Sequence, residues 1–145
     1  MALLVKICGL RTEAALDAAL DAGADLLGFV FFPKSPRHLT HHEAEPLGTR
    51  VRGRAGKVAL FVDPTDEDIA TAVDALSPDA LQLHGHETPE RVRAIKQRFS
   101  LPVTKAIAIG ARDDLDGIDK YAGAADRLLF DARPPRDATR PGGLG

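Results

Sequence analysis

Short runs of β-branched and leucine-rich residues alternate along this chain with longer segments of helical periodicity. Such alternation predicts strands and helices in turn. Turn-forming residues follow each apolar run, and no two runs are joined by a two-residue hairpin turn. The segments that we predict as strands are residues 3–7, 26–30, 57–62, 80–83, 102–107 and 127–131.

Three of the intervening segments carry clear helix signals. Thr65 can cap a helix whose first turn is acidic, where the positive end of the helix dipole favours carboxylates. Thr88 is followed by Pro89 in the first-turn position that proline tolerates best. The first helix is expected to follow Thr12 and to end near Gly23, a residue that readily adopts left-handed backbone angles.

Strands separated by helices favour parallel pairing through right-handed crossovers, which places the chain in the α/β class. No G-x-G-x-x-G turn follows the first strand and no phosphate loop of the Walker type occurs, so a nucleotide-binding open sheet loses its main support. A (β/α)₈ barrel normally needs about 200 residues or more. Residues 1–145 are expected to form a single domain. If that domain is a barrel rather than an open sheet, it is a partial one with about the first six strands.

The composition narrows the range of partners. With 44% hydrophobic and 28% charged residues, the chain is typical of a folded soluble domain. Its 19 basic and 21 acidic residues give a net charge of −2, which argues against binding to nucleic acid or to an anionic membrane surface. One cysteine excludes an internal disulfide, and no apolar run approaches the length of a membrane span. We expect a cytoplasmic protein.

Ligands of parallel α/β folds gather at the carboxyl ends of the strands, so polar residues there are candidates for chemistry. Cys8 ends the first strand, and Lys6 lies two residues earlier on the same side. An ammonium near the thiol would favour the thiolate, which can act as a base or nucleophile. The alternative is that Cys8 is a small buried filler.

Asp131 follows the apolar run of the sixth strand. A carboxyl group at the edge of a dry core favours its protonated form, which is what a proton donor needs. A helix cap or a partner for an arginine is the alternative role for Asp131.

Arg37 lies in a loop framed by two prolines. A guanidinium held in such a loop is suited to bind a carboxylate or phosphate. The alternative is that Arg37 is a solvated surface residue.

His84 is a candidate hydrogen-bond donor or acceptor at the rim of a pocket. His84 and His86 could form a metal pair, but no third ligand has a suitable spacing, and we predict no metal. Gly142 and Gly143 could bring backbone amides to a phosphate, although a frayed terminus is equally glycine-rich.

Four motifs occur together in a consistent order: Lys6-Ile7-Cys8-Gly9-Leu10, the Phe31 to Arg37 loop, Gln82-Leu83-His84-Gly85, and Leu129-Phe130-Asp131 followed by Gly142-Gly143. In this order and spacing the chain closely resembles the phosphoribosylanthranilate isomerase family of tryptophan biosynthesis. The resemblance covers the whole chain, and it implies the (β/α)₈ barrel rather than an open sheet.

The resemblance implies a cofactor-free Amadori rearrangement of N-(5'-phosphoribosyl)anthranilate to 1-(o-carboxyphenylamino)-1-deoxyribulose 5-phosphate. In the family pattern the residue matching Asp131 protonates the furanose oxygen, and the residue matching Cys8 removes the C2' proton. Arg37 is expected to hold the anthranilate carboxylate. Lys6, His84, Gly142 and Gly143 are the further substrate-binding candidates.

Two departures from the family pattern stand beside this resemblance. Leu144 occupies a glycine-loop position that usually carries a small or polar residue. The chain also looks truncated before strands seven and eight, whose loops often bind phosphate in such barrels.

One alternative is an inactive partial barrel that docks to a complementary fragment, or forms a homo-oligomer through the unpaired edges of the first and sixth strands. Another sugar-phosphate isomerase or lyase is a further alternative.

Overall fold

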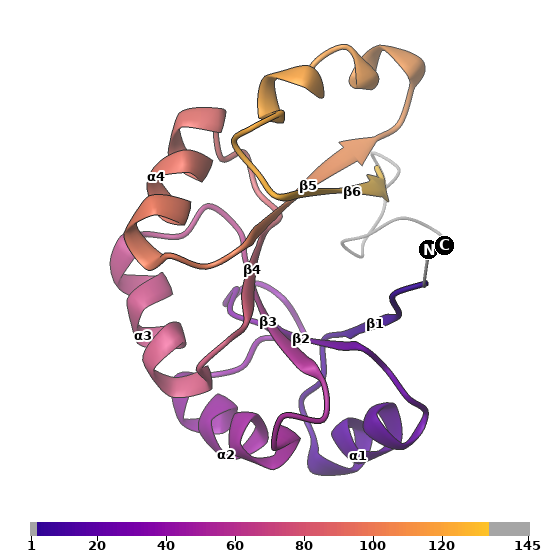
Figure 1. Ribbon diagram of the computed structural model, residues 1–145, viewed down its shortest axis with the longest axis vertical. Coiled ribbons are helices and arrows are strands. Elements are labelled where there is room, and N and C mark those ends of the chain that lie inside the picture. The colour runs from indigo at the N-terminus through magenta and orange to yellow at the C-terminus, as the bar shows by residue number, and fades with distance from the viewer. Residues whose placement is uncertain (1–2, 134–145) are drawn as a thin grey trace.

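The computed structural model describes residues 3–133, which form one curved sheet with helices along one face (Figure 1). The strands are β1 (Lys6–Cys8), β2 (Leu26–Val30), β3 (Gly56–Phe61), β4 (Ala80–Leu83), β5 (Val103–Ile109) and β6 (Arg127–Ala132). The helices are α1 (Glu13–Asp21), α2 (His41–Val51), α3 (Asp66–Leu76) and α4 (Pro89–Phe99).

The strands are hydrogen-bonded in the order β1-β2-β3-β4-β5-β6, and all five pairings are parallel. In a doubly wound open sheet the strand order reverses at a switch point, whereas in a barrel it follows the sequence. The unbroken order therefore confirms the predicted α/β barrel type, of which these six strands are a part.

The strand predictions succeed where an apolar run is bounded by turn residues. β2 and β4 have the predicted bounds, and β3 and β6 differ by a residue at their ends. β1 begins later than predicted, at Lys6, because Leu3 and Leu4 lie exposed outside the ladder. β5 continues to Ile109, where it still pairs with the end of β6.

Threonine caps begin all four helices, as the sequence predicts for those at Thr12, Thr65 and Thr88. Each threonine hydroxyl accepts a hydrogen bond from the backbone N–H three residues later. At Thr40 the capping box is complete, since the Glu43 carboxylate accepts the Thr40 backbone N–H in return. These bonds satisfy amides that the first helical turn leaves without partners.

The connection between β5 and β6 contains two short 3₁₀ turns, η1 (Arg112–Leu115) and η2 (Asp119–Tyr121), in place of a helix. Its sequence is rich in aspartate and glycine and has no apolar stripe of helical period. Tyr121 and Ala124 alone are buried here, so this segment covers its end of the sheet with few side chains.

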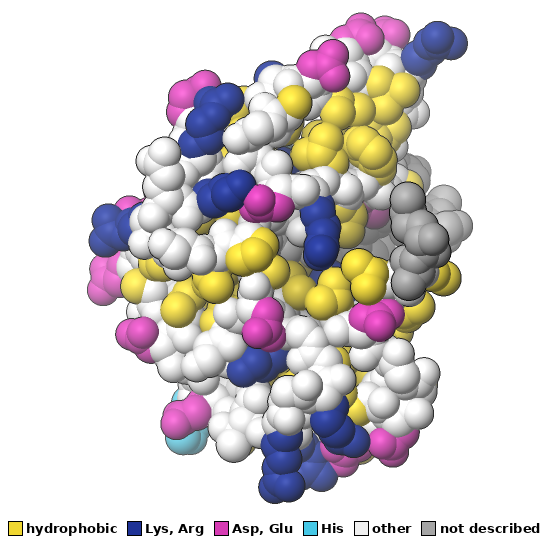
Figure 2. Space-filling view, in the orientation of Figure 1, with side chains coloured by type: hydrophobic (Ala, Val, Ile, Leu, Met, Phe, Trp, Pro, Cys, Tyr) yellow, Lys and Arg dark blue, Asp and Glu magenta, His cyan; other side chains and the backbone are white. Residues whose placement is uncertain are grey.

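The hydrophobic core lies between the sheet and the helices. Large side chains from both layers are fully buried, among them Leu16, Phe29, Phe61, Ile69 and Ile95. Figure 2 shows other hydrophobic side chains exposed on the viewed face, interspersed with isolated charged ones. No helix within residues 3–133 is long and apolar enough to cross a membrane.

The first and last strands are the edges of the sheet within the described part of the chain, and they lie at the two ends of its curvature (Figure 1). Apolar side chains are exposed at both edges: Leu3 is 84% exposed before β1, and Phe130 is 57% exposed on β6. Exposed edges with apolar side chains favour pairing with another chain.

We therefore predict that the 145-residue chain self-associates as its concentration rises, and static light scattering should detect the increase in mass. Phe130→Lys should weaken the association because a charge on an edge strand opposes pairing. Leu115→Lys is the matched control, since Leu115 is 47% exposed but lies in η1 and not on a strand. A constant monomer mass at every concentration would contradict this prediction.

Candidate active site

All six strands run in one direction, so their carboxyl ends lie along one edge of the sheet. Cys8 is the last residue of β1, His84 directly follows β4, and Asp131 lies near the end of β6. The long loop after β2 carries Arg37 to the same edge, where its guanidinium reaches the Cys8 carbonyl. The structure thus brings Cys8, Arg37, His84 and Asp131 to one edge, as the strand assignments predict.

Cys8 is half-buried and packs against a glycine on the neighbouring strand. The pairing of β1 with β2 sets Cys8 opposite Gly28, and a Cβ added at Gly28 would lie 2.7 Å from the Cys8 Sγ. Only glycine leaves room for the sulfur at this point. Sequence analysis did not identify Gly28, whose role depends on a register that only the structure reveals.

Arg37 lies over the β1–α1 turn. Its Nη1 donates to the Cys8 carbonyl oxygen at 3.3 Å, and a Cβ at Gly9 would lie 2.4 Å from the Arg37 Cδ. The loop itself is braced from both sides: the Ser35 hydroxyl accepts the Arg37 N–H, and Arg11 donates to the Pro36 carbonyl. Arg37 is therefore an anchored guanidinium beside Cys8 rather than a freely solvated one.

His84 and Asp131 are in direct contact. The His84 Nε2 lies 3.1 Å from an Asp131 carboxylate oxygen, and the Gln82 side-chain amide nitrogen lies 3.4 Å from the His84 Nδ1. An amide nitrogen can only donate, so Nδ1 accepts and neutral His84 carries its proton on Nε2. In this tautomer His84 donates to Asp131 Oδ2 and leaves the other carboxylate oxygen for a ligand.

The surroundings of Asp131 differ from the dry edge that the sequence suggests. Its side chain is 36% exposed, and the preceding Phe130 points to solvent instead of covering it. The described residues supply a histidine partner for the carboxylate rather than an apolar pocket. The apolar run is therefore a weaker guide to burial at an edge strand than at the centre of the sheet.

The two histidines of the His84-Gly85-His86 motif point to different partners. His86 is exposed, and its ring contacts the Asp63 carboxylate at 3.3 Å, while His84 contacts Asp131. No group of three or more metal-ligating side chains occurs within residues 3–133.

The remaining candidates are Lys6 and the two glycines. Lys6 is half-buried on β1, and its side chain lies on the same side of the strand as that of Cys8. Gly142 and Gly143 lie outside the described residues.

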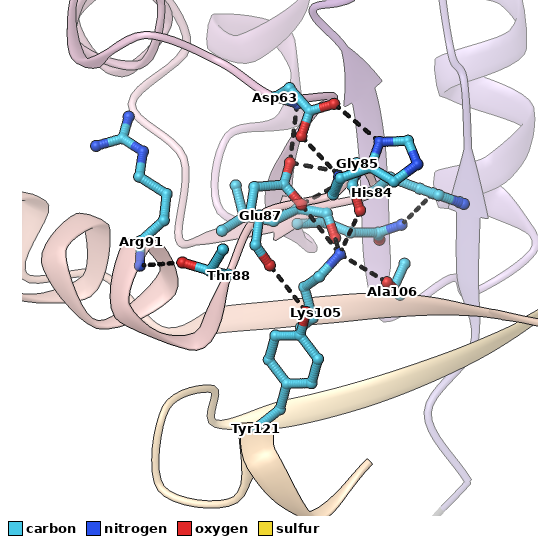
Figure 3. A network of polar contacts seen from close by, with 12 residues as sticks. Asp63, His84, Gly85, Glu87, Thr88, Arg91, Lys105, Ala106 and Tyr121 are labelled. Carbon is cyan, nitrogen blue, oxygen red and sulfur yellow. Dashed lines mark hydrogen bonds and ion pairs between the residues drawn. The ribbon is translucent and has the colours of Figure 1, made fainter. Parts of the chain in front are cut away.

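A buried ion pair that sequence analysis missed lies next to this edge. The Lys105 ammonium, on β5, is 3.0 Å from the Glu87 carboxylate, and both side chains are at most 3% exposed. Figure 3 shows the ammonium surrounded by the Glu87 carboxylate and by backbone carbonyls, with the Tyr121 ring alongside. No spacing pattern links Lys105 to Glu87, because the strand and loop that carry them meet only in three dimensions.

A cavity of about 570 Å³ opens beside this network, between the end of β5 and the 3₁₀ turns. Its wall includes His84, Lys105 and Tyr121. Burial, and then the negative charge of Glu87, raise the pKa of the Tyr121 hydroxyl, which donates to the Glu87 carbonyl. Backbone N–H donors of Gly110 and Ala111, together with Arg133, lower the pKa of Asp114 on the same wall.

We predict that His84 is held as the Nε2–H tautomer and that Gln82→Leu releases this preference, because the amide that donates to Nδ1 is lost. Imidazole ¹⁵N chemical shifts report the tautomer directly. Gln97→Leu, on the exposed side of α4, is the control and should leave the His84 shifts unchanged. A His84 ring with its proton on Nδ1 in the unaltered chain would contradict the assignment.

The family model for N-(5'phosphoribosyl)anthranilate (PRA) isomerase matches residues 5–145. An N-(5'-phosphoribosyl)anthranilate isomerase of Rhodopseudomonas palustris (strain HaA2) is 61% identical over the whole chain, which spans 66% of that relative's length.

Solved structures agree with this assignment. The crystal structure of phosphoribosyl anthranilate isomerase from Thermotoga maritima superposes with a TM-score of 0.85 at 30% identity, over 93% of this chain and 64% of that one. A phosphoribosyl anthranilate isomerase in complex with reduced 1-(o-carboxyphenylamino)-1-deoxyribulose 5-phosphate gives 0.82 at 29% identity, over 92% and 66%. Because the family match covers nearly all of its residues, this chain belongs to the N-(5'-phosphoribosyl)anthranilate isomerase family.

Proposed function

We propose that the protein catalyses the Amadori rearrangement of N-(5'-phosphoribosyl)anthranilate to 1-(o-carboxyphenylamino)-1-deoxyribulose 5-phosphate. Membership of the family supports this activity, and one solved relative binds a reduced form of that product. The observation that carries the proposal is the His84–Asp131 contact at the edge of the sheet where Cys8 also ends its strand.

The acid in this proposal is Asp131. A proton on Oδ1 is transferred to the ring oxygen of the ribose, so that the C1'–oxygen bond breaks and the substrate nitrogen forms a Schiff base with C1'. His84 donates to Oδ2 and fixes which oxygen of Asp131 faces the substrate. The proton donor is thereby oriented before the substrate arrives, which is the purpose of a positioned catalytic acid.

Cys8 is the base. As a thiolate it removes the C2' proton, and the electron pair of that bond moves to form the enolamine. The enolamine then tautomerises to the ketone, as its 2'-hydroxyl loses a proton and C1' gains one. Lys6 lies on the same side of β1 and is a further candidate for substrate binding. The close packing of Cys8 on Gly28 leaves the sulfur little freedom of position, which suits proton transfer over a short distance.

Arg37 binds the anthranilate carboxylate. A guanidinium presents two parallel N–H groups to a carboxylate, and the braced β2–α2 loop holds Arg37 beside Cys8 without a carboxylate partner within residues 3–133. The reaction needs only an acid and a base, so the proposal includes no cofactor. The phosphate contacts of Gly142 and Gly143 stay a prediction.

We also propose that the protein is cytoplasmic. The thiol of Cys8 is free, as suits a reducing compartment.

The first test replaces the two catalytic residues. Cys8→Ser and Asp131→Asn should each lower kcat by about 100-fold to 10,000-fold, the range lost with a general base or acid. Loss of anthranilate-adduct fluorescence measures turnover in the full chain. Asp79→Asn is the control, since Asp79 accepts a backbone N–H at the amino end of the strands. Normal turnover in both catalytic variants would refute the assigned roles.

The second test concerns the carboxylate. Arg37→Lys keeps the charge but removes the paired N–H groups, so KM should rise about 10-fold, equivalent to one good hydrogen bond to a charged group, with a smaller change in kcat. Lys34→Met removes the other cation of the same loop, an exposed one, and should leave KM unchanged. Equal effects of the two substitutions would mean that the loop contributes only general positive charge.

A further inference from the structure

The buried Lys105–Glu87 pair touches neither Cys8 nor Asp131, yet it is the most completely bonded charged pair in the described structure. The Lys105 ammonium lies 2.8 Å from the Gly85 carbonyl, 2.9 Å from the Ala106 carbonyl, 3.0 Å from the Glu87 carboxylate and 3.4 Å from the Leu83 carbonyl, so its three N–H groups are shared among four acceptors. A buried charge is costly unless such partners surround it.

Glu87 accepts hydrogen bonds from two loops as well as from Lys105. Its carboxylate takes the backbone N–H of Gly85 and, at 2.9 Å, the backbone N–H of Asp63, which follows β3. Asp63 in turn accepts the His86 N–H at 2.6 Å. The loops after β3 and β4 are therefore tied into one unit around a single buried carboxylate (Figure 3).

These bonds converge on the backbone of one residue. The Leu83 carbonyl belongs to the peptide group before His84, and the Gly85 N–H belongs to the peptide group after it. Lys105 holds the first of these groups and Glu87 holds the second. The His84 N–H is fixed as well, by the Phe61 carbonyl at 2.8 Å.

We propose that Lys105 and Glu87 are positioning residues, which clamp the backbone on both sides of His84 so that its ring meets the Asp131 carboxylate. This role rests on the proposed function, since Asp131 is the proton donor there. A displacement of about 1 Å at a reacting group can cost about 100-fold in rate. The clamp should therefore act on kcat, because it orients the acid and does not contact the substrate.

Charge on Glu87 is essential to this geometry because every neighbour of its carboxylate is a donor. A glutamine side chain would turn its NH₂ group toward either the Lys105 ammonium or a backbone N–H, and neither can accept a hydrogen bond. The loop that carries His84 is also packed closely against Asp63, since a Cβ added at Gly85 would lie 2.5 Å from the Asp63 carboxylate. The loop cannot shift to relieve the mismatch without moving His84.

The test compares two carboxylate-to-amide substitutions in the full chain. Glu87→Gln should lower kcat by about 10-fold to 100-fold while KM changes by less than about 3-fold. Asp126→Asn is the matched control, because Asp126 also pairs with a lysine, Lys96 at 2.6 Å, and accepts a backbone N–H, that of Val103 at 2.8 Å, but at the amino ends of the strands. Its kcat should stay within about 2-fold of normal.

A second measurement does not depend on turnover. In the unaltered chain the ¹⁵N shifts of the His84 ring should change on Asp131→Asn, because the two side chains are bonded; in the Glu87→Gln background the same substitution should leave them unchanged. Failure of the isomerase activity would remove the kinetic comparison but not this one. A His84 ring that still responds to Asp131 in folded Glu87→Gln protein would overturn the proposal.

The double variant Lys105→Met/Glu87→Gln distinguishes a positioning role of the pair from a role in folding stability alone. It removes both buried charges, so it should regain the folding stability that Glu87→Gln alone loses, as judged by urea unfolding. The backbone around His84 stays unclamped, and kcat should remain low. Recovery of both stability and kcat in the double variant would show that the pair serves folding alone and would refute the positioning role.

Discussion

Parallel alignment of the six strands is the constraint on which the site depends. It fixes the carboxyl ends of β1, β4 and β6 along one edge, so residues more than a hundred positions apart, Cys8 and Asp131, share that edge. The helices enforce the alignment, because each crossover returns the chain to the same end of the sheet. The chemistry then needs only suitable side chains at the strand ends, and the loops can differ without changing the direction in which these side chains point.

Burial of charge separates the supporting Lys105–Glu87 pair from the candidate site residues His84 and Asp131. Lys105 and Glu87 are almost fully buried, whereas His84 and Asp131 are each about one third exposed. A catalytic acid must meet solvent and substrate, but its support gains from exclusion of water, since hydrogen bonds to charged groups strengthen in a low dielectric. The same contrast occurs at Arg37, where the exposed guanidinium donates to the Cys8 carbonyl on β1 while the backbone N–H of Arg37 donates to the Ser35 hydroxyl.

Local sequence patterns predicted the elements well and the contacts between them poorly. Threonine caps and bounded apolar runs located the helices and most strands, because these signals act within a few residues. Cys8, His84 and Asp131 were selected as candidates for the same reason, as polar residues that end apolar runs. Gly28 and Glu87 were missed, and Gln82 was noted only as part of a motif, because their roles depend on strand register or on a contact visible only in the structure. The segment between β5 and β6 lacks helical periodicity, and it folds as 3₁₀ turns.

Gln82 shows how far the influence of a single buried side chain extends. It is 3% exposed on β4, and its amide nitrogen sets the tautomer of His84, whose other nitrogen then donates to Asp131. Because the Nε2–H bond points at Oδ2, Gln82 also determines which Asp131 oxygen is bonded to His84 and which is left for a ligand, although Gln82 itself contacts neither Asp131 nor Cys8.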